Sequence, residues 1–290
     1  MPKNNNIKKE DFPMKIRFGE DPETNYYNSQ NNIKITTIQS PPSNYKEMCY
    51  NMIMSTWDDN PYSSVSYSDY YDENIDKTFE DLLSFKVLPN SMESLIFVFR
   101  IEGLTHIEIS HLLRHRLFFS IHAQCSGDRF LNHDSVFIPS SIENSKFRRQ
   151  YKHITELAKE LYVEMVDSKE ISLMDARYIL TRNHRYFYYV GMNLKDALSF
   201  INQRKCTMIQ PELDNIMAHK IYNNIIKCIP EVKKVATLEC TKGCHFVRSS
   251  NKRNTRLYQP DKNHDELFDY NSDNFVYDKT REKMGIKNTK

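Results

Sequence analysis

The residues best suited to bind or react with a ligand are consecutive in the sequence. They are Arg114, His115 and Arg116, which follow an apolar run that ends at Leu113. Arginine offers planar, bidentate hydrogen bonding to phosphate, and histidine donates or accepts a hydrogen bond near neutral pH. Neighbouring side chains on a helix point about 100° apart, so one small ligand cannot meet all three from an uninterrupted helix. The triplet therefore indicates a helix end or a shared site for a polyanion. The alternative is a solvated basic helix end stabilised by the helix dipole.

The elements just before the triplet position it. Residues 94–101, SLIFVFRI, are almost continuously apolar, which predicts a strand buried on both faces. Thr105 followed by Glu108 is a capping-box pattern, so a helix should begin there and carry the triplet at its C-terminal end.

Several other elements are predicted from apolar spacing, cap residues and prolines. Strands are expected at residues 33–38, 136–139 and 185–192, and helices at residues 45–57 (capped by Ser43), 75–86 and 141–169. Three further helices are expected to begin at Ser172 with Asp175, at Asn193 with Asp196, and at Pro211. The first two of these helices carry Arg177 and Arg204. Residues 58–74 are expected to form a surface loop, and Ile154, Leu157, Leu161 and Met165 share one face suited to scaffold or oligomer contact.

Composition limits the classes of function. The net charge is +2 with a pI near 8.1, so there is no general attraction to nucleic acid. The six cysteines form no regular framework, which favours a reducing compartment. No stretch is apolar enough for a membrane span or a signal peptide, so we expect a soluble, cytoplasmic protein without a membrane partner. Polar extensions at residues 1–32 and 231–290 are predicted to flank one domain at 33–230, the first of them disordered.

Cofactor signatures are sparse. Cys240, Cys244 and His245 form a single C-x-x-x-C-H pattern with no second pair, which is a weak zinc signal, so no metal site is predicted. The chain has only six glycines and no phosphate-binding loop or dinucleotide fingerprint, which argues against a Rossmann site.

Two separate blocks nevertheless resemble one known family. The segment RHRLFFSIHAQCSGDRF, from Arg114 to Phe130, resembles the signature of the flavin-dependent thymidylate synthases, in which Arg-His-Arg is followed after seven residues by Ser and then by Arg-Tyr. Downstream, DARYILTRNHRYFYYVGMNLKDALSFINQR is similar to the second block of that family, which ends Asn-x-Arg. The matching blocks lie between Ile33 and Pro230 and mark the chain as a divergent member.

The resemblance implies an α+β fold, with a mixed α/β subunit that assembles as a homotetramer around shared active sites holding FAD. In that family NADPH reduces the flavin, methylenetetrahydrofolate donates one carbon, and dUMP becomes dTMP. The expected partners are therefore dUMP or a related pyrimidine nucleotide, folate and further copies of the chain.

The resemblance also assigns roles by position. Arg114 and Arg204 are expected to be catalytic, with Arg204 facing the uracil carbonyl and stabilising charge that develops on the ring. The expected flavin-binding residues are Ser55, Arg114, His115, Arg116, Asn193, Lys195 and Ser199. The expected nucleotide-binding residues are His111, Arg114, Gln124, Ser126, Arg129, Arg177 and Arg204. For Ser55 the alternative is a polar residue at a helix end, and for Arg177 and Arg204 a surface salt bridge.

This chain departs from the family pattern in ways that leave its substrate open. Nine residues, not seven, separate Arg116 from Ser126, so a strict count puts Gln124 at the serine position. Phe130 replaces the usual Tyr, and Lys195 and Ser199 stand where Arg and Asn are common; Lys cannot reproduce a guanidinium fork. Besides thymidylate synthase, two hypotheses remain: a divergent methylase or hydroxymethylase of UMP or dUMP on the same fold, and a catalytically silent nucleotide-binding or assembly protein.

The extra residues predict the local backbone. On one continuous helix, two additional residues rotate everything after them by about 200°. Ser126 and Arg129 would then turn away from the ligand of Arg114. The segment must therefore be a loop or contain a bulge, which Gly127 permits, if the phosphate contact survives. We expect Ser126, not Gln124, to be the counterpart of the family serine.

Overall fold

The computed structural model describes residues 33–56, 74–115, 120–124, 136–205 and 210–236. Along the chain the elements are β1 (Lys34–Gln39), α1 (Tyr45–Ser55), α2 (Asn74–Leu83), the 3-10 helix η2 (Pro89–Ser94), β2 (Ile96–Thr105), α3 (His106–Leu112), β3 (Ser120–Ala123), α4 (Ser140–Glu143), α5 (Arg148–Ser168), α6 (Leu173–Ala176), η3 (Arg177–Ile179), β4 (Arg185–Asn193), α7 (Leu194–Arg204), α8 (Glu212–Cys228) and η4 (Pro230–Lys234).

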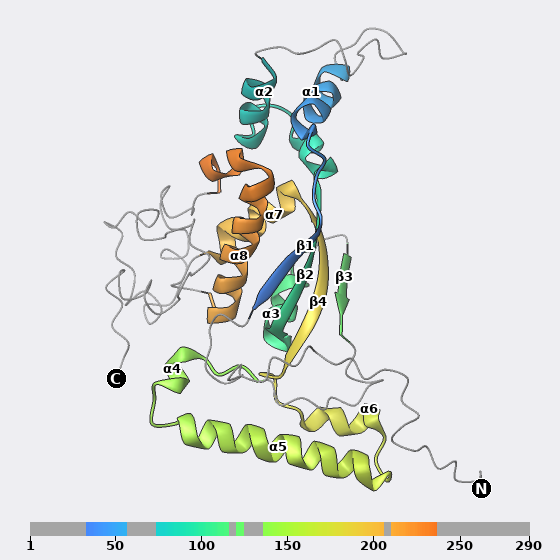
Figure 1. Ribbon diagram of the computed structural model, residues 1–290, viewed down its shortest axis with the longest axis vertical. Coiled ribbons are helices and arrows are strands. Elements are labelled where there is room, and N and C mark those ends of the chain that lie inside the picture. Colours follow the sequence, from blue (N-terminus) through green and yellow to red (C-terminus); the bar gives the residue numbers. More distant parts are fainter. Residues whose placement is uncertain (1–32, 57–73, 116–119, 125–135, 206–209, 237–290) are drawn as a thin grey trace, which may run out of the picture.

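The strands form one antiparallel sheet in the order β1-β2-β4-β3 (Figure 1). The central pair runs from Ile96 opposite Asn193 to Thr105 opposite Arg185. Its register shifts between Glu102 and Leu104, where Gly103 takes the left-handed backbone conformation (φ 89°) that glycine allows without steric cost. The mixed α/β architecture with an antiparallel sheet agrees with the expected fold class.

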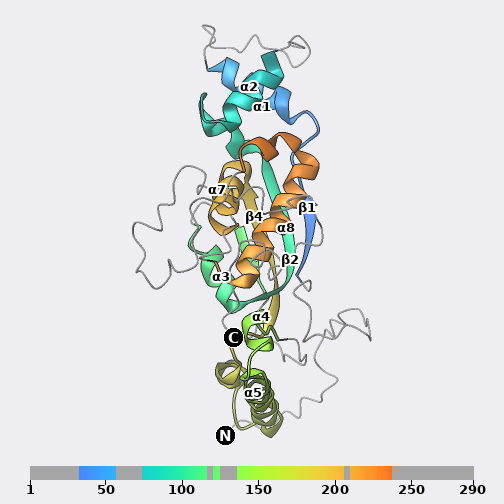
Figure 2. The same cartoon turned by 90° about the vertical axis from the view of Figure 1, so that its left-hand side faces the viewer.

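This pairing decides where the following helices meet. Because β2 and β4 are antiparallel, α3 begins at one end of the sheet and α7 at the other. Both helices fold back along the same face, which also carries α8 (Figures 1 and 2). At 1.5 Å per residue they cover about 10 Å and 16 Å, against a strand of about 30 Å. Their C-terminal ends therefore approach each other near the middle of the sheet.

The core lies between this face of the sheet and its helices. Phe97, Phe99 and Ile101 are fully buried, whereas Ile96, Val98 and Arg100, which point the other way, are only partly buried. The expected burial of this strand on both faces is therefore wrong. The structure has the alternation of a strand covered mainly on one side.

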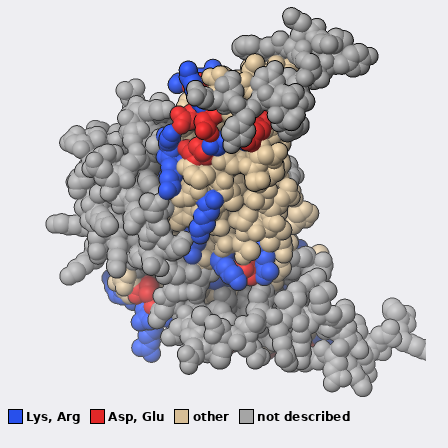
Figure 3. All heavy atoms as spheres, turned by 45° about the horizontal axis from the view of Figure 1, so that its top comes forward, with Lys and Arg blue, Asp and Glu red and all other residues tan. Residues whose placement is uncertain are grey.

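The two ends of the sheet carry separate groups of helices. Helices α1 and α2 lie beyond one end, and α5 and α6 beyond the other (Figure 1). Ion pairs connect α1 to α2 and η4: Lys46 lies 2.7 Å from Asp76 and 2.6 Å from Glu231. Figure 3 shows acidic and basic side chains intermixed at this end. The Lys46–Asp76 pair, whose carboxylate is exposed, contributes little stability by itself.

Some local predictions are confirmed and others are wrong. Thr105 forms the predicted capping box with Glu108. Ser43, however, does not cap α1, whose N-cap residue is Asn44 without a side-chain hydrogen bond. The strand expected at 136–139 is a single bridge between Val136 and His184. The strand β3 was not predicted.

Other predictions lie outside the described residues, among them the loop at 58–74, the N-terminal extension and almost all of the C-terminal one. The domain boundaries stay predictions. None of the helices in the described part of the chain combines the length and apolar content that crossing a bilayer requires.

Candidate functional site

The turn after α3 presents part of the basic triplet. The helix starts at its capping box, where the Thr105 backbone N–H donates to Glu108 Oε2 at 2.9 Å, and it ends at Leu112. Arg114 and His115 follow in a turn, their backbone N–H groups donating to the carbonyls of His111 and Leu112. Arg114 is exposed and His115 partly buried. The geometry matches the helix end that the spacing required; Arg116 lies outside the described residues.

His115 is held against α7. Its ring meets the ring of Phe200 edge-on, with the centroids 5.1 Å apart. Burial lowers the pKa of His115 to about 4, and the neighbouring Arg204 and His111 act in the same direction. His115 is therefore a neutral imidazole at neutral pH, able to donate one hydrogen bond and accept another.

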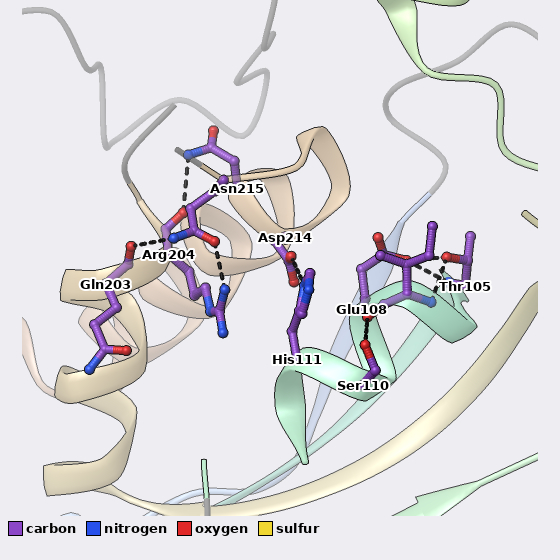
Figure 4. Close-up of polar contacts among 10 residues, drawn as sticks. Thr105, Glu108, Ser110, His111, Gln203, Arg204, Asp214 and Asn215 are labelled. Atoms are coloured by element: carbon purple, nitrogen blue, oxygen red, sulfur yellow. Dashed lines mark hydrogen bonds and ion pairs between the residues drawn. The ribbon is translucent and has the colours of Figure 1, made fainter. Parts of the chain in front are cut away.

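Arg204 ends α7 and reaches the same region (Figure 4). Its Nη1 donates to Gln210 Oε1 at 2.6 Å, and its backbone carbonyl accepts from Asn215 Nδ2 at 3.2 Å. Its Nε is buried and has no hydrogen-bond partner among the described residues. The Arg204 guanidinium can therefore still donate a hydrogen bond to a ligand. Gln210 and Asn215 fix the end of α7 that carries Arg204.

A buried carboxylate completes this cluster. Asp214, in the first turn of α8, accepts a hydrogen bond from Nδ1 of His111 on α3, and its side chain has no solvent exposure (Figure 4). Burial raises the pKa of Asp214, and the neighbouring His111 and Arg204 partly offset the rise.

We define the α3/α7/α8 cluster as His111, Arg114, His115, Arg204 and Asp214. Asp214 is the member that sequence reasoning missed. An acidic residue in the first turn of a helix ordinarily indicates favourable interaction with the dipole. Nothing local in the sequence shows that α3 would cover it.

Other predicted site residues lie away from this cluster. Asn193, Lys195 and Ser199 are on the first half of α7: Asn193 caps the helix, Lys195 pairs with Glu93 at 2.7 Å, and Ser199 accepts from Gln203 at 3.4 Å. Eleven helical residues place Asn193 about 16 Å from Arg204. One chain therefore does not bring both ends of α7 to one small ligand.

Ser55 and Arg177 lie at opposite ends of the molecule. Ser55 ends α1, is exposed, and donates to the Asn51 carbonyl at 2.6 Å. Arg177 begins η3, packs over the Tyr178 ring at 5.8 Å, and is close enough to His106 to lower the pKa of that histidine, although burial lowers it more. Their assignment to flavin and nucleotide stays a prediction.

The segment after the triplet is not one continuous helix. Strand β3 pairs with β4. Gln124, directly after β3, continues this pairing. Its backbone N–H donates to the Phe187 carbonyl at 3.1 Å, and its Oε1 accepts from the Phe187 N–H at 3.4 Å. Ser126 and Arg129 lie outside the described residues. So do Cys240, Cys244 and His245; the described residues contain no group of three side chains suited to a metal.

Comparison with known proteins agrees with the resemblance. The Thy1 family, described as "Thymidylate synthase complementing protein", matches residues 42–231. A flavin-dependent thymidylate synthase of Pyrococcus abyssi is 26% identical over 201 residues, which cover 67% of this chain and 80% of the relative. One from Clostridium tetani is 24% identical over 195 residues, covering 60% and 76%.

The fold also matches a solved structure. A crystal structure of the UMP/dUMP methylase PolB from Streptomyces cacaoi, bound with 5-Br dUMP, aligns with a TM-score of 0.57 and 15% identity. The match covers 70% of this chain and 94% of that one. At this identity the likeness shows the fold alone. Because the family match spans most of the chain, and the described cluster contains the Arg-His pair of its signature, the protein belongs to the Thy1 family of thymidylate synthase complementing proteins.

Proposed function

We propose that this protein is an FAD-dependent thymidylate synthase that reductively methylates dUMP to dTMP with methylenetetrahydrofolate and NAD(P)H. The observation that carries the proposal is that His115, the neighbour of Arg114 in the turn after α3, lies against α7 close to Arg204. Arg204 keeps a buried Nε without a partner among the described residues. Arg114 is exposed in the turn after α3. Family membership and relatives named flavin-dependent thymidylate synthase support it.

The residues of the cluster have distinct roles in this reaction. Arg204 faces the uracil carbonyl and stabilises the negative charge that develops when the ring is attacked. Arg114 offers a bidentate fork to the nucleotide and the flavin. His115, neutral because its pKa is low, donates or accepts a hydrogen bond without adding charge.

The residues present fit a flavin. The exposed guanidinium of Arg114 and the exposed side of α7, with Ser199 and the partly exposed Lys195, offer donors to a cofactor that carries phosphates. Arg114, His115, Arg116, Asn193, Lys195 and Ser199 would hold it, with Ser55. When bound, FAD supplies the reducing equivalents. The chain itself orients the two substrates and keeps water from the reacting atoms.

We further propose that the sites are shared between the subunits of a homotetramer. Within one chain, Ser55 ends α1, which lies beyond the end of the sheet and away from the cluster (Figure 1), so a second subunit supplies Ser55 to the same flavin in this proposal. Helix α5 offers a surface for association: Ile154, Leu157 and Leu161 share one face and are 60%, 48% and 43% exposed. Such an apolar row on a helix is typical of a contact surface.

The test of the activity is product formation by the purified protein. Incubation with FAD, NADPH, methylenetetrahydrofolate and dUMP should yield a nucleotide 14 mass units heavier, the mass that a CH₂ group adds when CH₃ replaces H. Arg204→Ala should slow product formation about 10²- to 10³-fold, whereas Arg149→Ala, an exposed arginine of α5, should not. A folded, flavin-loaded protein that leaves dUMP unchanged would contradict the proposal.

The same assay separates the alternatives. The Lys195 and Ser199 departures leave a UMP or dUMP methylase open, and the structural neighbour carries that name. UMP in place of dUMP, with the product mass distinguishing methyl from hydroxymethyl, tests that alternative. Binding of nucleotide without flavin or product would instead indicate the silent binding protein.

Subunit mixing tests the sharing of sites. The turn after α3 and Arg204 lie together within one chain, so the informative partner is Ser55. Arg204→Ala tetramers and inactive Ser55→Asp tetramers should regain activity after exchange if Ser55 of each site comes from a second chain. No recovery, with exchange proven by mass-tagged subunits, would place Ser55 and Arg204 of one site in the same chain.

A further inference from the structure

The His111–Asp214 pair has a geometry that a purely structural bridge does not require. The Asp214 side chain is completely buried, whereas the His111 side chain is 21% exposed. Asp214 occupies Nδ1 of the ring, and within the described part of the chain Nε2 has no hydrogen-bond partner. Asp214 is thus closed off from solvent, whereas a ligand can reach Nε2 of His111.

Arg204 lies in the same region as His111. Both residues are close enough to Asp214 and to His115 to shift the pKa values of those two groups. Figure 4 shows Arg204 extending from α7 toward the side of α3 that carries His111. The site therefore combines a guanidinium donor with a neighbouring imidazole.

The buried carboxylate determines what the imidazole offers. An ionised Asp only accepts hydrogen bonds, so its partner Nδ1 must carry the proton. In a neutral ring the remaining Nε2 is then an acceptor. The second oxygen of Asp214, Oδ1, is buried and has no hydrogen-bond partner among the described residues, so Nδ1–H is the hydrogen-bond donor that compensates this carboxylate.

We propose that Asp214 is a positioning residue that holds His111 with Nε2 as an acceptor, so that His111 and Arg204 together select a uracil-type base. This inference rests on the proposed function and deepens it. Uracil presents an N3–H donor beside a carbonyl acceptor. Nε2 of His111 accepts from that N–H, while Arg204 donates to the carbonyl. Cytosine has a lone pair at N3, which would meet the lone pair of Nε2 and leave both unsatisfied.

The competing explanation is that the pair only joins α3 to α8. Glu108 provides the matched control, because it is also a buried carboxylate associated with α3, but its oxygens bond to Thr105 at the opposite end of the helix. Glu108→Gln should lower the free energy of unfolding without changing base selection. Asp214→Asn should change base selection, because an amide can donate to Nδ1 and so reverse the tautomer, as happens with the Asp of a Ser-His-Asp triad.

The experiment measures binding of dUMP and dCMP to the full-length, flavin-loaded wild type, Asp214→Asn and Glu108→Gln. We expect the dUMP-to-dCMP affinity ratio to fall at least about tenfold in Asp214→Asn and to stay unchanged in Glu108→Gln. The ring-nitrogen NMR signals of His111 in ¹⁵N-histidine-labelled wild type should show the Nδ1–H tautomer.

An unchanged dUMP-to-dCMP affinity ratio in Asp214→Asn, with a loss of stability like that of Glu108→Gln, would mean that the His111–Asp214 pair only joins α3 to α8. An Nε2–H tautomer in the wild type would overturn the proposal even where Asp214→Asn fails to fold.

Failure of this inference is distinct from failure of the proposed function. If dTMP forms but the ratio is insensitive to Asp214→Asn, only the inference fails. If the ratio responds but no dTMP forms, the inference holds and the proposed reaction fails.

Discussion

The ring of His115 lies edge-on against the ring of Phe200, which fastens the turn after α3 to the middle of α7. The contact follows from the sheet, because antiparallel β2 and β4 send these two helices toward each other along one face. His115 and Arg204 reach one region as a result, although 89 positions separate them in the sequence.

Removal of the Arg204 guanidinium should reduce catalysis far more than folding. Arg204→Ala removes a donor for the developing charge, and we expect kcat/KM for dUMP to fall about 10²- to 10³-fold. Arg204→Lys keeps the charge but not the fork, so its kcat/KM should recover only in part. Steady-state kinetics with Arg149→Ala as control provide the measurement. Wild-type kinetics for Arg204→Ala would exclude it from the site.

Asn193 should have two separable roles. Its side chain caps α7 by accepting from the Asp196 N–H at 2.9 Å, so Asn193→Ala should lower the free energy of unfolding by about 1 kcal/mol. Ser172→Ala, which removes a comparable cap from α6, is the matched control. If Asn193 also binds flavin, only Asn193→Ala should weaken FAD binding, measured by flavin fluorescence. Equal FAD affinity in both variants would leave Asn193 as a cap alone.

These caps show what the sequence could predict and what it could not. The starts of α3, α6 and α7 are confirmed because each depends on residues three apart, Thr105 with Glu108, Ser172 with Asp175, and Asn193 with Asp196. Strand β3 was missed because a four-residue strand is defined by its partner β4, about 70 positions away.

The candidate site divides in the same way. Arg114, His115 and Arg204 were predicted from the family motifs, which are local strings of residues. Asp214 was not, because its burial exists only when α3 packs on α8. Ser43 failed as a cap because Asn44 is the N-cap residue of α1, a difference of one residue that propensity cannot resolve.

The exposed row on α5 should be needed for assembly but not for folding of the subunit. Leu157→Glu places a charge in the apolar row, so we expect a smaller species in sedimentation velocity with unchanged helical content by circular dichroism. Glu156→Lys also changes charge on α5, but away from the row, and should leave the assembly intact. A Leu157→Glu protein of wild-type size would show that subunits meet elsewhere.

Acid should destabilise the protein through histidines whose pKa values folding lowers. Burial lowers the pKa of His219 well below 6.5, and the pKa values of His115 and His106 are also lowered. The unfolded chain therefore takes up protons first as pH falls below 6.5, and the folded state loses stability. Asp214 and Glu108 act with the opposite sign, because burial raises their pKa values and the folded state binds their protons more readily.

Denaturant unfolding at pH 7.5 and 5.5 checks the histidine contribution. His219→Gln should show a smaller loss of stability between these two pH values than the wild type. The exposed His153→Gln should keep the wild-type loss. Identical pH dependence in all three proteins would mean that His219 is not a source of the effect.

The last prediction concerns the two extra residues between Arg116 and Ser126. Gln124 is the residue that a strict count aligns with the family serine, but its amide oxygen accepts from the Phe187 N–H and its backbone belongs to the edge of β4. A side chain held at a sheet edge has little capacity left for a phosphate. Ser126, two residues later, lies outside the described residues and stays the predicted phosphate ligand with Arg129.

Ser126→Ala should therefore weaken dUMP binding about ten- to a hundredfold, the cost of one hydrogen bond to a charged phosphate. Gln124→Ala should leave the affinity near the wild-type value and instead lower the stability of the β3 edge, because Phe187 N–H loses an acceptor. Calorimetric titration with dUMP and, as a control without phosphate, deoxyuridine measures both effects. The Ser126→Ala loss should vanish for deoxyuridine, since the nucleoside has no phosphate to hold. A large loss confined to Gln124→Ala would instead make Gln124 the phosphate ligand and show that the chain tolerates the insertion by shifting β3 along β4.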